Sequence, residues 1–510
     1  MTAQFAIGMA ILAPLLGAIG IQLTGRWPNL RETVTLVSAG AAFLFVQSLV
    51  SLVFGGGRPE LTLVADVLPG VDLAFQVEPL GMLYALVAAS LWIPTSLYAV
   101  GYMRGHNEGN QTRFFTCFAL AIFAALGIAF SKNVFTLFLF YEILTFSTYP
   151  LVTHYGDDEA KRAGRIYMGI LVTTSVAFLL LAVIMTQALA GTLDFKPGGI
   201  LAGKVDGLMV PFLLALYAFG TGKAALMPFH KWLPNAMVAP TPVSALLHAV
   251  AIVKAGVFTV LKVVVYVFGI DFLTTTAASE WLMWVAAFTL LSSSVIALTK
   301  DNLKARLAYS TISQLAYITL GAAIATKAAI AGAAMHIAMH AIGKITLFFC
   351  AGAIYVALHK KYISQMNGIG RQMPFTMAAF FLGSICIIGL PPMGGSWSKW
   401  YLCLGALDAG QTVFVFVLMA SSLLSIGYLM PVVYRAFFFE PDPDDHHHGH
   451  HGDHHDDGHG GHEPKEGFWA NINEAPILCV APLCLTALGC IALFFLAPHI
   501  YNLVITITEV

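Results

Sequence analysis

The chain has 510 residues, of which 58% are hydrophobic and 10% are charged, and its mean hydropathy is +0.79. Soluble domains carry charge on about a quarter of their residues, so this composition predicts an integral membrane protein and excludes a set of soluble domains. The formal net charge of −1 gives no reason to expect nucleic acid, and the seven cysteines include no C-x-x-C pair that would indicate a zinc or iron–sulfur site. We therefore expect no cofactor and no metal in this chain.

Apolar windows of about 20 residues, the length that crosses a bilayer as a helix, recur along the whole chain. They predict an all-α polytopic membrane protein with about 14 transmembrane helices. The two windows at 114–130 and 134–153 are the least distinct pair, because only three residues separate them. The expected spans lie near residues 4–23, 32–54, 80–102, 114–130, 134–153, 166–189, 208–228, 242–269, 281–298, 305–325, 329–357, 375–403, 411–437 and 475–506.

Basic residues cluster in alternate loops between these spans, and the other loops carry mainly acidic residues. The positive-inside rule places the basic loops in the cytoplasm. An even number of spans then puts both termini outside, in a multi-pass protein of the inner (plasma) membrane of the cell. The basic loops contain Arg26, Arg31, Arg104, Arg113, Lys161, Arg162, Arg165, Lys300, Lys304, Arg306, Lys360, Lys361 and Arg371.

One long polar insertion joins the last two spans. It contains nine histidines between His446 and His462, several aspartates and almost no apolar residues, which predicts a disordered cytoplasmic loop. Its composition is typical of metal-binding tracts, but it shows no ligand geometry. A solvated, weakly buffering loop is the favoured interpretation.

An internal repeat is indicated by a shift of 176 residues, which takes Lys223 to Lys399 and Met168 to Lys344. Each of these positions falls in the expected span if spans four to eight recur as spans nine to thirteen. Five crossings are an odd number, so the second copy would be inverted, an architecture found in transporters. The expected segments are 1–105 (N-terminal three-helix segment), 112–269 and 280–438 (the two five-helix repeats), 439–468 (His/Asp-rich loop) and 473–510 (C-terminal helix).

Glu142 and Lys223 are charged residues inside otherwise apolar spans. Such residues are rare, because a charge in hydrocarbon costs about 3 kcal/mol or more, and they usually serve a function. We expect the two to form a buried ion pair, since removing one partner would strand the other. The alternative is a static pair that only holds two helices together.

Two spans are predicted to be broken in the middle. Pro228 and Pro234 follow Lys223 closely, and the segment 389–395, with the sequence GLPPMGG, precedes Lys399. Prolines interrupt the helical hydrogen-bond ladder, which frees carbonyl groups near each lysine. The alternative for Lys399 is a side chain that extends to the membrane surface.

His336, His340 and Lys344 are spaced four residues apart, so a helix would place them in a column on one face. Histidine exchanges protons near neutral pH, and the column is therefore predicted to pass protons. Inert polar packing is one alternative. A metal site is another, although two histidines without a local carboxylate make a poor one.

Three more polar residues lie in the expected span 242–269. Lys254 and Lys262 share a face of a helix, whereas His248 would point elsewhere on a regular helix and serve a different gap. Lys262 lies nearer the outer end of the span. The alternative to a role in the polar face is that its side chain only extends to the membrane surface. Lys304, at the start of another span, is expected to be an interface anchor.

Several motifs resemble the antiporter-like subunits shared by Mrp-type cation/proton antiporters, respiratory complex I and membrane-bound hydrogenases. The resemblance covers nearly the whole chain. Within it, the stretch 141–151 (YEILTFSTYPL) and the length of the chain are most similar to the Mrp D-type branch, and the histidine-rich loop departs from the usual pattern. The motifs are 230–234 (HKWLP), 240–249 (PTPVSALLHA), 307–314 (LAYSTISQ) and 389–392 (GLPP).

The resemblance implies 14 helices, two inverted five-helix repeats, two broken helices and a central hydrophilic axis. It also implies a proton-translocating subunit of a multisubunit Na⁺ or K⁺/proton antiporter, which works with other membrane subunits in a lipid bilayer. The residues expected to carry protons are Glu142, Lys223, His248, Lys254, His336, His340, Lys344 and Lys399.

Two other functions remain open from the sequence. The first is a proton-pumping subunit of a complex I-like oxidoreductase or a hydrogenase, in which other subunits perform the redox chemistry. The second is a membrane scaffold whose charges only hold helices and partners together. Under each of them the chain itself is not an enzyme.

Overall fold

Apolar segments in a membrane form helices because each backbone N–H and C=O must find its partner within the segment. The computed structural model describes residues 2–441 and 472–508, and in this part twelve helices are long and apolar enough to cross a membrane. They are α1 (Ala3–Leu23), α2 (Pro28–Phe54), α3 (Pro79–Gly105), α4 (Gln111–Ala129), α5 (Val134–Val152), α6 and α7 joined as Asp158–Ala190, α10 and α11 joined as Thr241–Phe268, α13 (Glu280–Thr299), α14 (Leu303–Ile324), α15 (Lys327–Leu358), α19 (Thr412–Phe438) and α20 (Ile477–Ile505).

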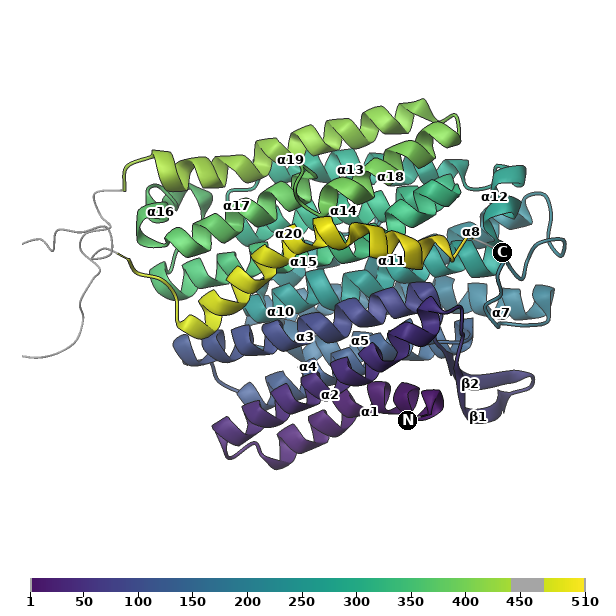
Figure 1. The fold of residues 1–510 in the computed structure, drawn as a ribbon, viewed down its shortest axis with the longest axis horizontal. Helices are drawn as coiled ribbons and strands as arrows, with labels where there is room; N and C mark the ends of the chain where they lie inside the picture. The colour runs from purple at the N-terminus through teal and green to yellow at the C-terminus, as the bar shows by residue number, and fades with distance from the viewer. Residues whose placement is uncertain (1, 442–471, 509–510) are drawn as a thin grey trace, which may run out of the picture.

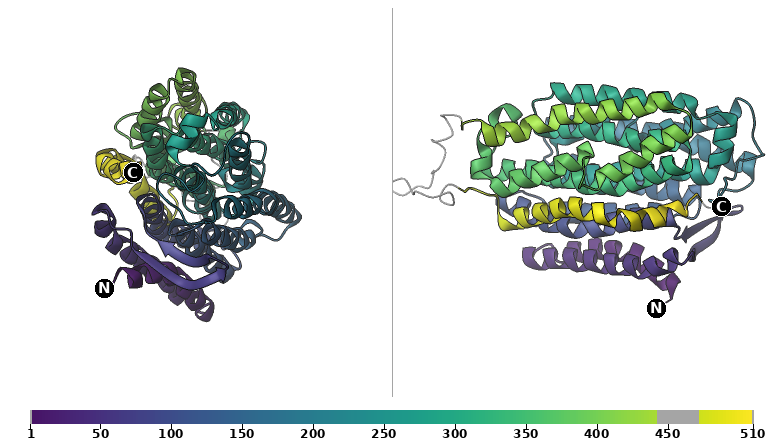
Figure 2. Two further views of the ribbon diagram at one scale, coloured as in Figure 1. Left: turned by 90° about the vertical axis from the view of Figure 1, so that its right-hand side faces the viewer. Right: turned by 45° about the horizontal axis from the view of Figure 1, so that its top comes forward.

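The helices run side by side along the long direction of the molecule (Figure 1). Helices α1 and α2 form one edge of the bundle and α19 the opposite edge, with α11, α14 and α15 between them. Both termini lie at the end of the bundle that carries a small β-hairpin, which we call the hairpin end (Figure 2). Residues 441 and 472 lie at the opposite end, which we call the loop end.

Both spans that were predicted to be broken are interrupted, the second at the predicted turn and the first several residues earlier than the prolines indicated. Helix α8 (Met209–Gly220) ends before a short 3₁₀ turn that contains Lys223, and the chain then forms only short helices up to α10 (Thr241–Ala245). Helix α17 (Pro374–Ile388) ends at Gly389, and α18 (Gly395–Asp408) begins after the turn. Gly389 has a φ of +90°, a conformation that glycine adopts without strain.

The hairpin is a feature that the all-α expectation missed. Strands β1 (Glu60–Leu68) and β2 (Val71–Gln76) pair antiparallel, and β2 buries Val71, Ala74 and Phe75. It lies over the α4–α5 loop, where the Lys132 N–H donates to the Ala74 carbonyl over 3.0 Å. The Lys132 ammonium also bonds Glu60 over 2.6 Å, and this hydrogen bond raises the pKa of Lys132. These strands were overlooked because they are too short to register as a span.

The structure tests some of the expectations about segments and leaves others untested. The closely spaced windows at 114–130 and 134–153 form two distinct helices, α4 and α5. Most of the His/Asp-rich loop predicted at 439–468 lies outside the described residues. The inverted repeats, the segment boundaries and the total of 14 spans stay predictions.

Candidate functional site

Lys223 lies in the first helix break and is completely buried. Its ammonium donates to the Tyr141 carbonyl over 2.9 Å and to the Thr145 hydroxyl over 2.6 Å. The same nitrogen lies 3.1 Å from the centre of the Tyr141 ring, a short cation–π contact. The break therefore inserts the lysine against one face of α5, where oxygen and π electrons replace water as its neighbours.

The predicted Glu142–Lys223 ion pair is not formed in this structure. No salt bridge within 4.0 Å joins these two residues, and Glu142 Oε1 is buried without a hydrogen-bond partner. The reason is helical geometry: Tyr141 and Thr145 are four residues apart and share a face, whereas Glu142 is turned by about 100° from Tyr141. Lys223 therefore has two neighbouring sets of acceptors and occupies one of them.

Lys254 connects α11 to α15. Its ammonium is in contact with Nδ1 of His340, and the ring of His340 stacks on that of His336 with their centres 5.8 Å apart. His336 in turn bonds the Ser398 hydroxyl on α18 over 2.9 Å and the Gln314 side chain on α14 over 3.2 Å. Four helices thus contribute to one polar cluster in the middle of the bundle, in which ring stacking and not a hydrogen bond joins the two histidines.

Lys344 is the third residue of the predicted column, but it leaves the line of the two histidines. Its ammonium donates to the Ser310 hydroxyl over 2.6 Å and to the Leu307 carbonyl over 3.3 Å, both on α14. Ser310 donates onward to the Tyr428 hydroxyl over 2.9 Å, and Tyr428 contacts the Ser425 hydroxyl over 2.9 Å. Hydroxyl groups therefore lead from Lys344 to α19, away from the two histidines.

Lys399 lies at the second break and is 8% exposed, which argues against a side chain that extends to the surface. Its ammonium donates to the carbonyls of Ile387 and Ile388 over 2.9 and 3.0 Å, and to the Ser422 hydroxyl over 3.0 Å. These carbonyls are free because α17 ends at Ile388. The break was predicted to expose carbonyls beside this lysine, and it does so.

His248 is fully buried, and neither ring nitrogen has a hydrogen-bond partner among the described residues. It lies in a π-helical turn, Leu246–Val250, which changes its direction relative to that on a regular helix. At the end of this turn the Ala251 carbonyl accepts a hydrogen bond from Tyr84 over 3.0 Å. The ring rests on Phe348, with the centres 4.7 Å apart.

Lys262 does not extend to the surface, which was the alternative for it. It is completely buried, lies 3.3 Å from Glu78 Oε1 and donates to the Ser131 carbonyl over 2.8 Å. Glu78 was missed because a carboxylate just before a proline and an apolar run also fits a helix N-cap. It does cap α3, since its oxygens accept from the N–H groups of Leu80 and Gly81.

The serines and tyrosine of the α14–α19 contact were also missed. Hydroxyl groups in membrane helices commonly bond the carbonyl of the preceding turn, so the sequence gives them no distinguishing signal. Here several also bond each other across helices, in addition to such a carbonyl bond as that from Ser294 to Leu290. Ser294, Ser313 and Ser421 lie mutually within 2.8–3.2 Å and join α13, α14 and α19.

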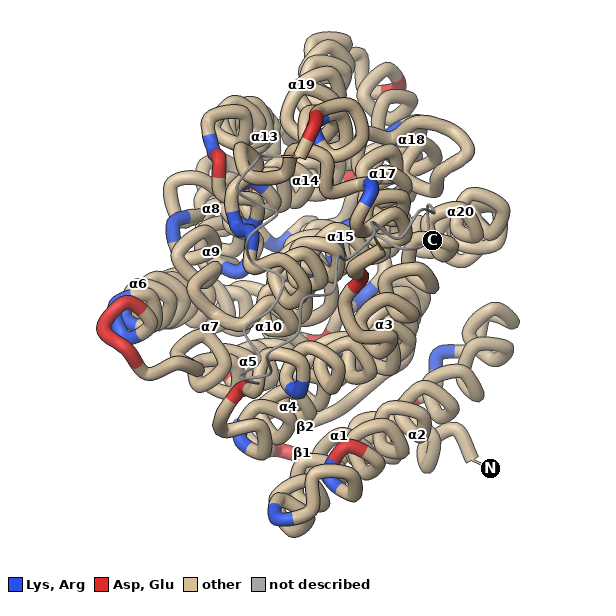
Figure 3. Tube along the Cα trace, turned by 90° about the vertical axis from the view of Figure 1, so that its left-hand side faces the viewer, with Lys and Arg blue, Asp and Glu red and all other residues tan. Residues whose placement is uncertain are grey.

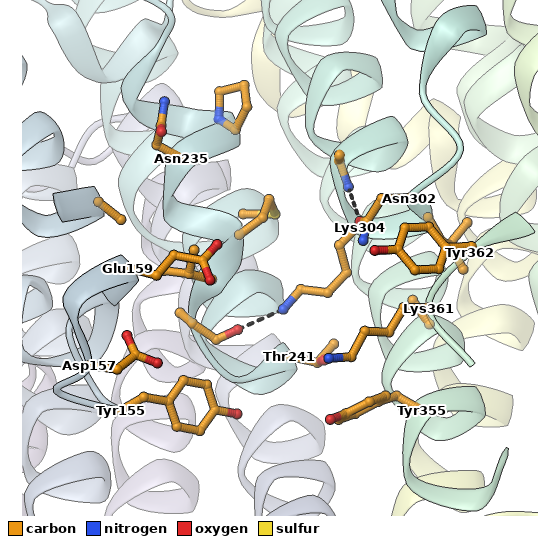
Figure 4. A pocket seen from close by; sticks show the side chains of 18 of the residues that line it. Tyr155, Asp157, Glu159, Asn235, Thr241, Asn302, Lys304, Tyr355, Lys361 and Tyr362 are labelled. Atoms are coloured by element: carbon orange, nitrogen blue, oxygen red, sulfur yellow. Dashed lines mark hydrogen bonds between the residues drawn. The ribbon is translucent and has the colours of Figure 1, made fainter. Parts of the chain in front are cut away.

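A cavity of about 880 Å³ opens at the loop end, between the first break and α14. In Figure 3, which looks at this end, Lys and Arg lie inside the bundle as well as at its rim. Lys304 points into the cavity and donates to the Ala239 carbonyl over 2.6 Å, just before the helix that carries His248 (Figure 4). Lys304 was expected to be an interface anchor, yet it forms part of the cavity wall. The other charged residues on the wall are Asp157, Glu159, Arg162, Lys360 and Lys361, and His106 lies beside them.

Several known proteins are similar to this chain in sequence and in fold. The chain is 33% identical over 448 residues to NADH-quinone oxidoreductase subunit N of Desulforudis audaxviator, covering 86% of this chain and 87% of that protein. It is 30% identical over 349 residues to the putative antiporter subunit mnhA2 of Staphylococcus haemolyticus, covering 64% of this chain but only 42% of that protein. Its fold superposes on a chain of the Mrp complex from Dietzia sp. with a TM-score of 0.83 at 20% identity, covering 100% and 97% of the two chains.

A family model describes the part of the chain that contains the site. Residues 131–425 match the family "NADH:quinone oxidoreductase/Mrp antiporter, TM". This segment is more than half of the chain and includes all eight residues that the sequence indicated for proton transfer. The chain therefore belongs to the NADH:quinone oxidoreductase/Mrp antiporter membrane family.

Proposed function

We propose that this protein is the proton-translocating, D-type subunit of a multisubunit Na⁺ or K⁺/proton antiporter of the inner membrane. The observation that carries the proposal is the polar contact Lys254–His340–His336 through the centre of the bundle, with Lys223 and Lys399 at the two helix breaks. Buried groups of this kind are costly in a membrane and mark ion pathways. The proposed partners are other membrane subunits, protons and the exchanged cation.

Protons enter through the loop-end cavity, which faces the cytoplasm in the orientation that the basic loops favour. The cavity wall reaches Thr241, seven residues and about 10 Å along the helix from His248. From there the contact between Lys254 and the two histidines leads across the bundle. The hydroxyl groups of Ser310, Tyr428 and Ser425 extend the polar contact from Lys344 to α19, next to the serine that holds Lys399.

The two sets of acceptors near Lys223 supply a switch. With its ammonium on Tyr141 and Thr145, Lys223 leaves Glu142 without a partner. Movement of the ammonium onto Glu142 would form the ion pair that the sequence predicts and would favour the charged lysine. Return to Tyr141 and Thr145 would favour release of the proton toward Lys254. Alternation between these two arrangements is the proposed driving step.

A second function, a proton-pumping subunit of an NADH-quinone oxidoreductase or a hydrogenase, is supported by the 33% identity to a subunit N over most of both chains. The same pathway serves both functions, and the subunits that accompany the chain distinguish them. Native mass spectrometry of the complex purified through this chain should show small hydrophobic subunits and no flavin or iron–sulfur protein. Flavin or iron–sulfur subunits in the complex would assign the redox-driven function instead.

The pathway itself is tested in proteoliposomes that contain the purified complex. Glu142→Ala, Lys223→Ala and Lys399→Ala should each abolish proton transport while the subunits still co-purify. Asp408→Ala, at the end of α18 and outside the pathway, is the control and should transport normally. Full transport by all three pathway variants would refute proton conduction by this chain and favour a scaffold.

A further inference from the structure

A second buried lysine–carboxylate pair lies apart from the pathway described above. Glu78, at the start of α3, is 3.3 Å from Lys262 on α11, and both side chains are almost completely shielded, with 4% and 0% exposure. The Tyr266 hydroxyl donates to the other oxygen of Glu78 over 2.9 Å. The Ser131 carbonyl in the α4–α5 loop accepts from Lys262. Three segments therefore meet at one titratable cluster: the start of α3, the helix that carries Lys262 and Tyr266, and the α4–α5 loop.

The cluster lies between the central pathway and the hairpin end. Lys262 is eight residues beyond Lys254, about 12 Å along the same helix. Ser131, which holds Lys262, belongs to the loop that the hairpin covers, where the Gln76 N–H donates to the Phe130 carbonyl over 2.7 Å. The ring of Phe258 lies 5.3 Å from the Lys262 ammonium and stands between the two lysines along the helix.

A small crevice adjoins the pair on its other side. Its volume is about 80 Å³, enough for a few water molecules, and it is lined by Pro79, the residue next to Glu78, and by Arg58, Asn502 and Thr506. Arg58 is the charged residue in the wall of this crevice. The crevice therefore brings Arg58, Asn502 and Thr506 to the first residue of α3, which follows the carboxylate in the sequence, at the hairpin end.

We propose that Glu78 and Lys262 form an access point for protons at the hairpin end, separate from Lys399. The proposal rests on the proton-transport function proposed above and assigns a second pair of residues to it. In the step, the N–H bond of the Lys262 ammonium breaks and an O–H bond forms on Glu78 Oε1. The protonated carboxyl then passes this proton to water in the crevice. Neutral Lys262 regains a proton that leaves Lys254 through intervening water molecules, because the two lysines lie about 12 Å apart along the helix. Both residues return to their starting charges.

A static role makes a different prediction for one substitution. Arginine keeps the positive charge and the ion pair with Glu78, but its guanidinium does not release a proton in proteins. A pair that only anchors α3 to α11 therefore tolerates Lys262→Arg. A pair that exchanges protons does not tolerate this substitution.

The test measures proton transport by the complete complex in proteoliposomes, with pH varied only on the hairpin side. Lys262→Arg and Glu78→Gln should each slow transport at least tenfold and remove its response to that pH. Glu78→Asp keeps a titratable group and should retain part of the transport rate and part of the response to hairpin-side pH. Wild-type rate and pH response in Lys262→Arg would overturn the proposal.

A double variant covers the case in which single substitutions strand a charge and prevent assembly. Glu78→Gln/Lys262→Gln leaves two neutral hydrogen-bonding groups, so the complex should assemble, but its transport should lose the response to hairpin-side pH. A normal response would overturn the proposal. Glu142→Ala, Lys223→Ala and Lys399→Ala, measured in parallel, test the main pathway. Full transport by all three refutes the proposed function, whereas their inactivity beside a normal double variant rejects this access point alone.

Discussion

In the proposed pathway, protons pass between Lys344 and Lys399 through single uncharged side chains, because no charged residue lies between them among the contacts described. The link runs through hydroxyl groups: Lys344 donates to Ser310, Ser310 to Tyr428, and Tyr428 contacts Ser425, which lies three residues from Ser422 on α19. Hydroxyl groups both donate and accept, so a file of them can pass a proton by rotation. Tyr428 is the member that spans the gap between α14 and α19.

Tyr428→Phe should therefore slow proton transport about tenfold without loss of the folded complex. The ring stays in place and only the hydroxyl is removed, at a cost of about 1 kcal/mol for a buried hydrogen bond. Tyr434→Phe is the matched control, because Tyr434 lies on the same helix and is 57% exposed. This variant should transport protons normally. Equal rates for the two variants would show that protons do not use the hydroxyl link.

Among the individual residues of the candidate site, some could be predicted from the sequence and others could not. Charges in apolar spans are visible in the sequence because they are rare there, and Lys223, Lys254 and Lys399 were all identified in this way. The Glu142–Lys223 pair was predicted from charge alone and failed on helical geometry, which turns Glu142 away from the face that Lys223 meets. Tyr428 and Glu78 were missed because a tyrosine in an apolar span and a glutamate before a helix have ordinary structural explanations.

At the scale of elements, the position of Lys223 depends on how closely α11 approaches the first break. Gly256 on α11 makes this approach possible: a Cβ atom there would lie 2.3 Å from the Ala224 backbone nitrogen and 2.4 Å from the Lys223 carbonyl carbon. Both neighbours are backbone atoms, which cannot rotate away. Any side chain at position 256 must therefore separate the two elements.

Gly256→Ala should move Lys223 away from Lys254 and slow transport strongly, with a destabilisation of about 1–3 kcal/mol that is typical of overpacking. The matched control is Gly169→Ala on α6, where a Cβ atom meets nothing within 4 Å. That variant should be neutral or slightly more stable, because alanine favours a helix. Thermal unfolding and transport of both variants check the prediction, and a neutral Gly256→Ala would contradict it.

Elements also differ in how well the sequence predicts them. The long helices follow from hydrophobic length alone, and the break at 389–394 follows from proline and glycine. Prolines also explain the first break from Pro228 onward, but that break begins at Thr221, before them. The π-turn at Leu246–Val250 was not predicted, because an extra residue in a helical turn leaves no compositional signal. It is this turn that gives His248 its direction, so the role of that residue depends on structure that the sequence does not reveal.

For the whole molecule, the two ends of the bundle differ in a way that fits transport from one side to the other. The loop end carries the large cavity, and the hairpin end carries both termini and the Glu78–Lys262 pair. The positive-inside rule assigns the loop end to the cytoplasm, because Lys300, Lys304 and Lys361 lie there. The proposed direction of each access point depends on this assignment.

The orientation predicts which positions a membrane-impermeant thiol reagent can reach on intact cells. All seven native cysteines lie within helices, so they give little background labelling by such a reagent. Thr2→Cys, at the hairpin end, should be labelled from outside, whereas Ser364→Cys, at the loop end, should be labelled only after the membrane is opened. Both positions are exposed in the structure, so a difference between them reports the side of the membrane and not burial. If Ser364→Cys were labelled from outside and Thr2→Cys only after the membrane is opened, the cavity would face outward. The Glu78–Lys262 pair would then lie on the cytoplasmic side, and protons from the cytoplasm would have to enter through this pair.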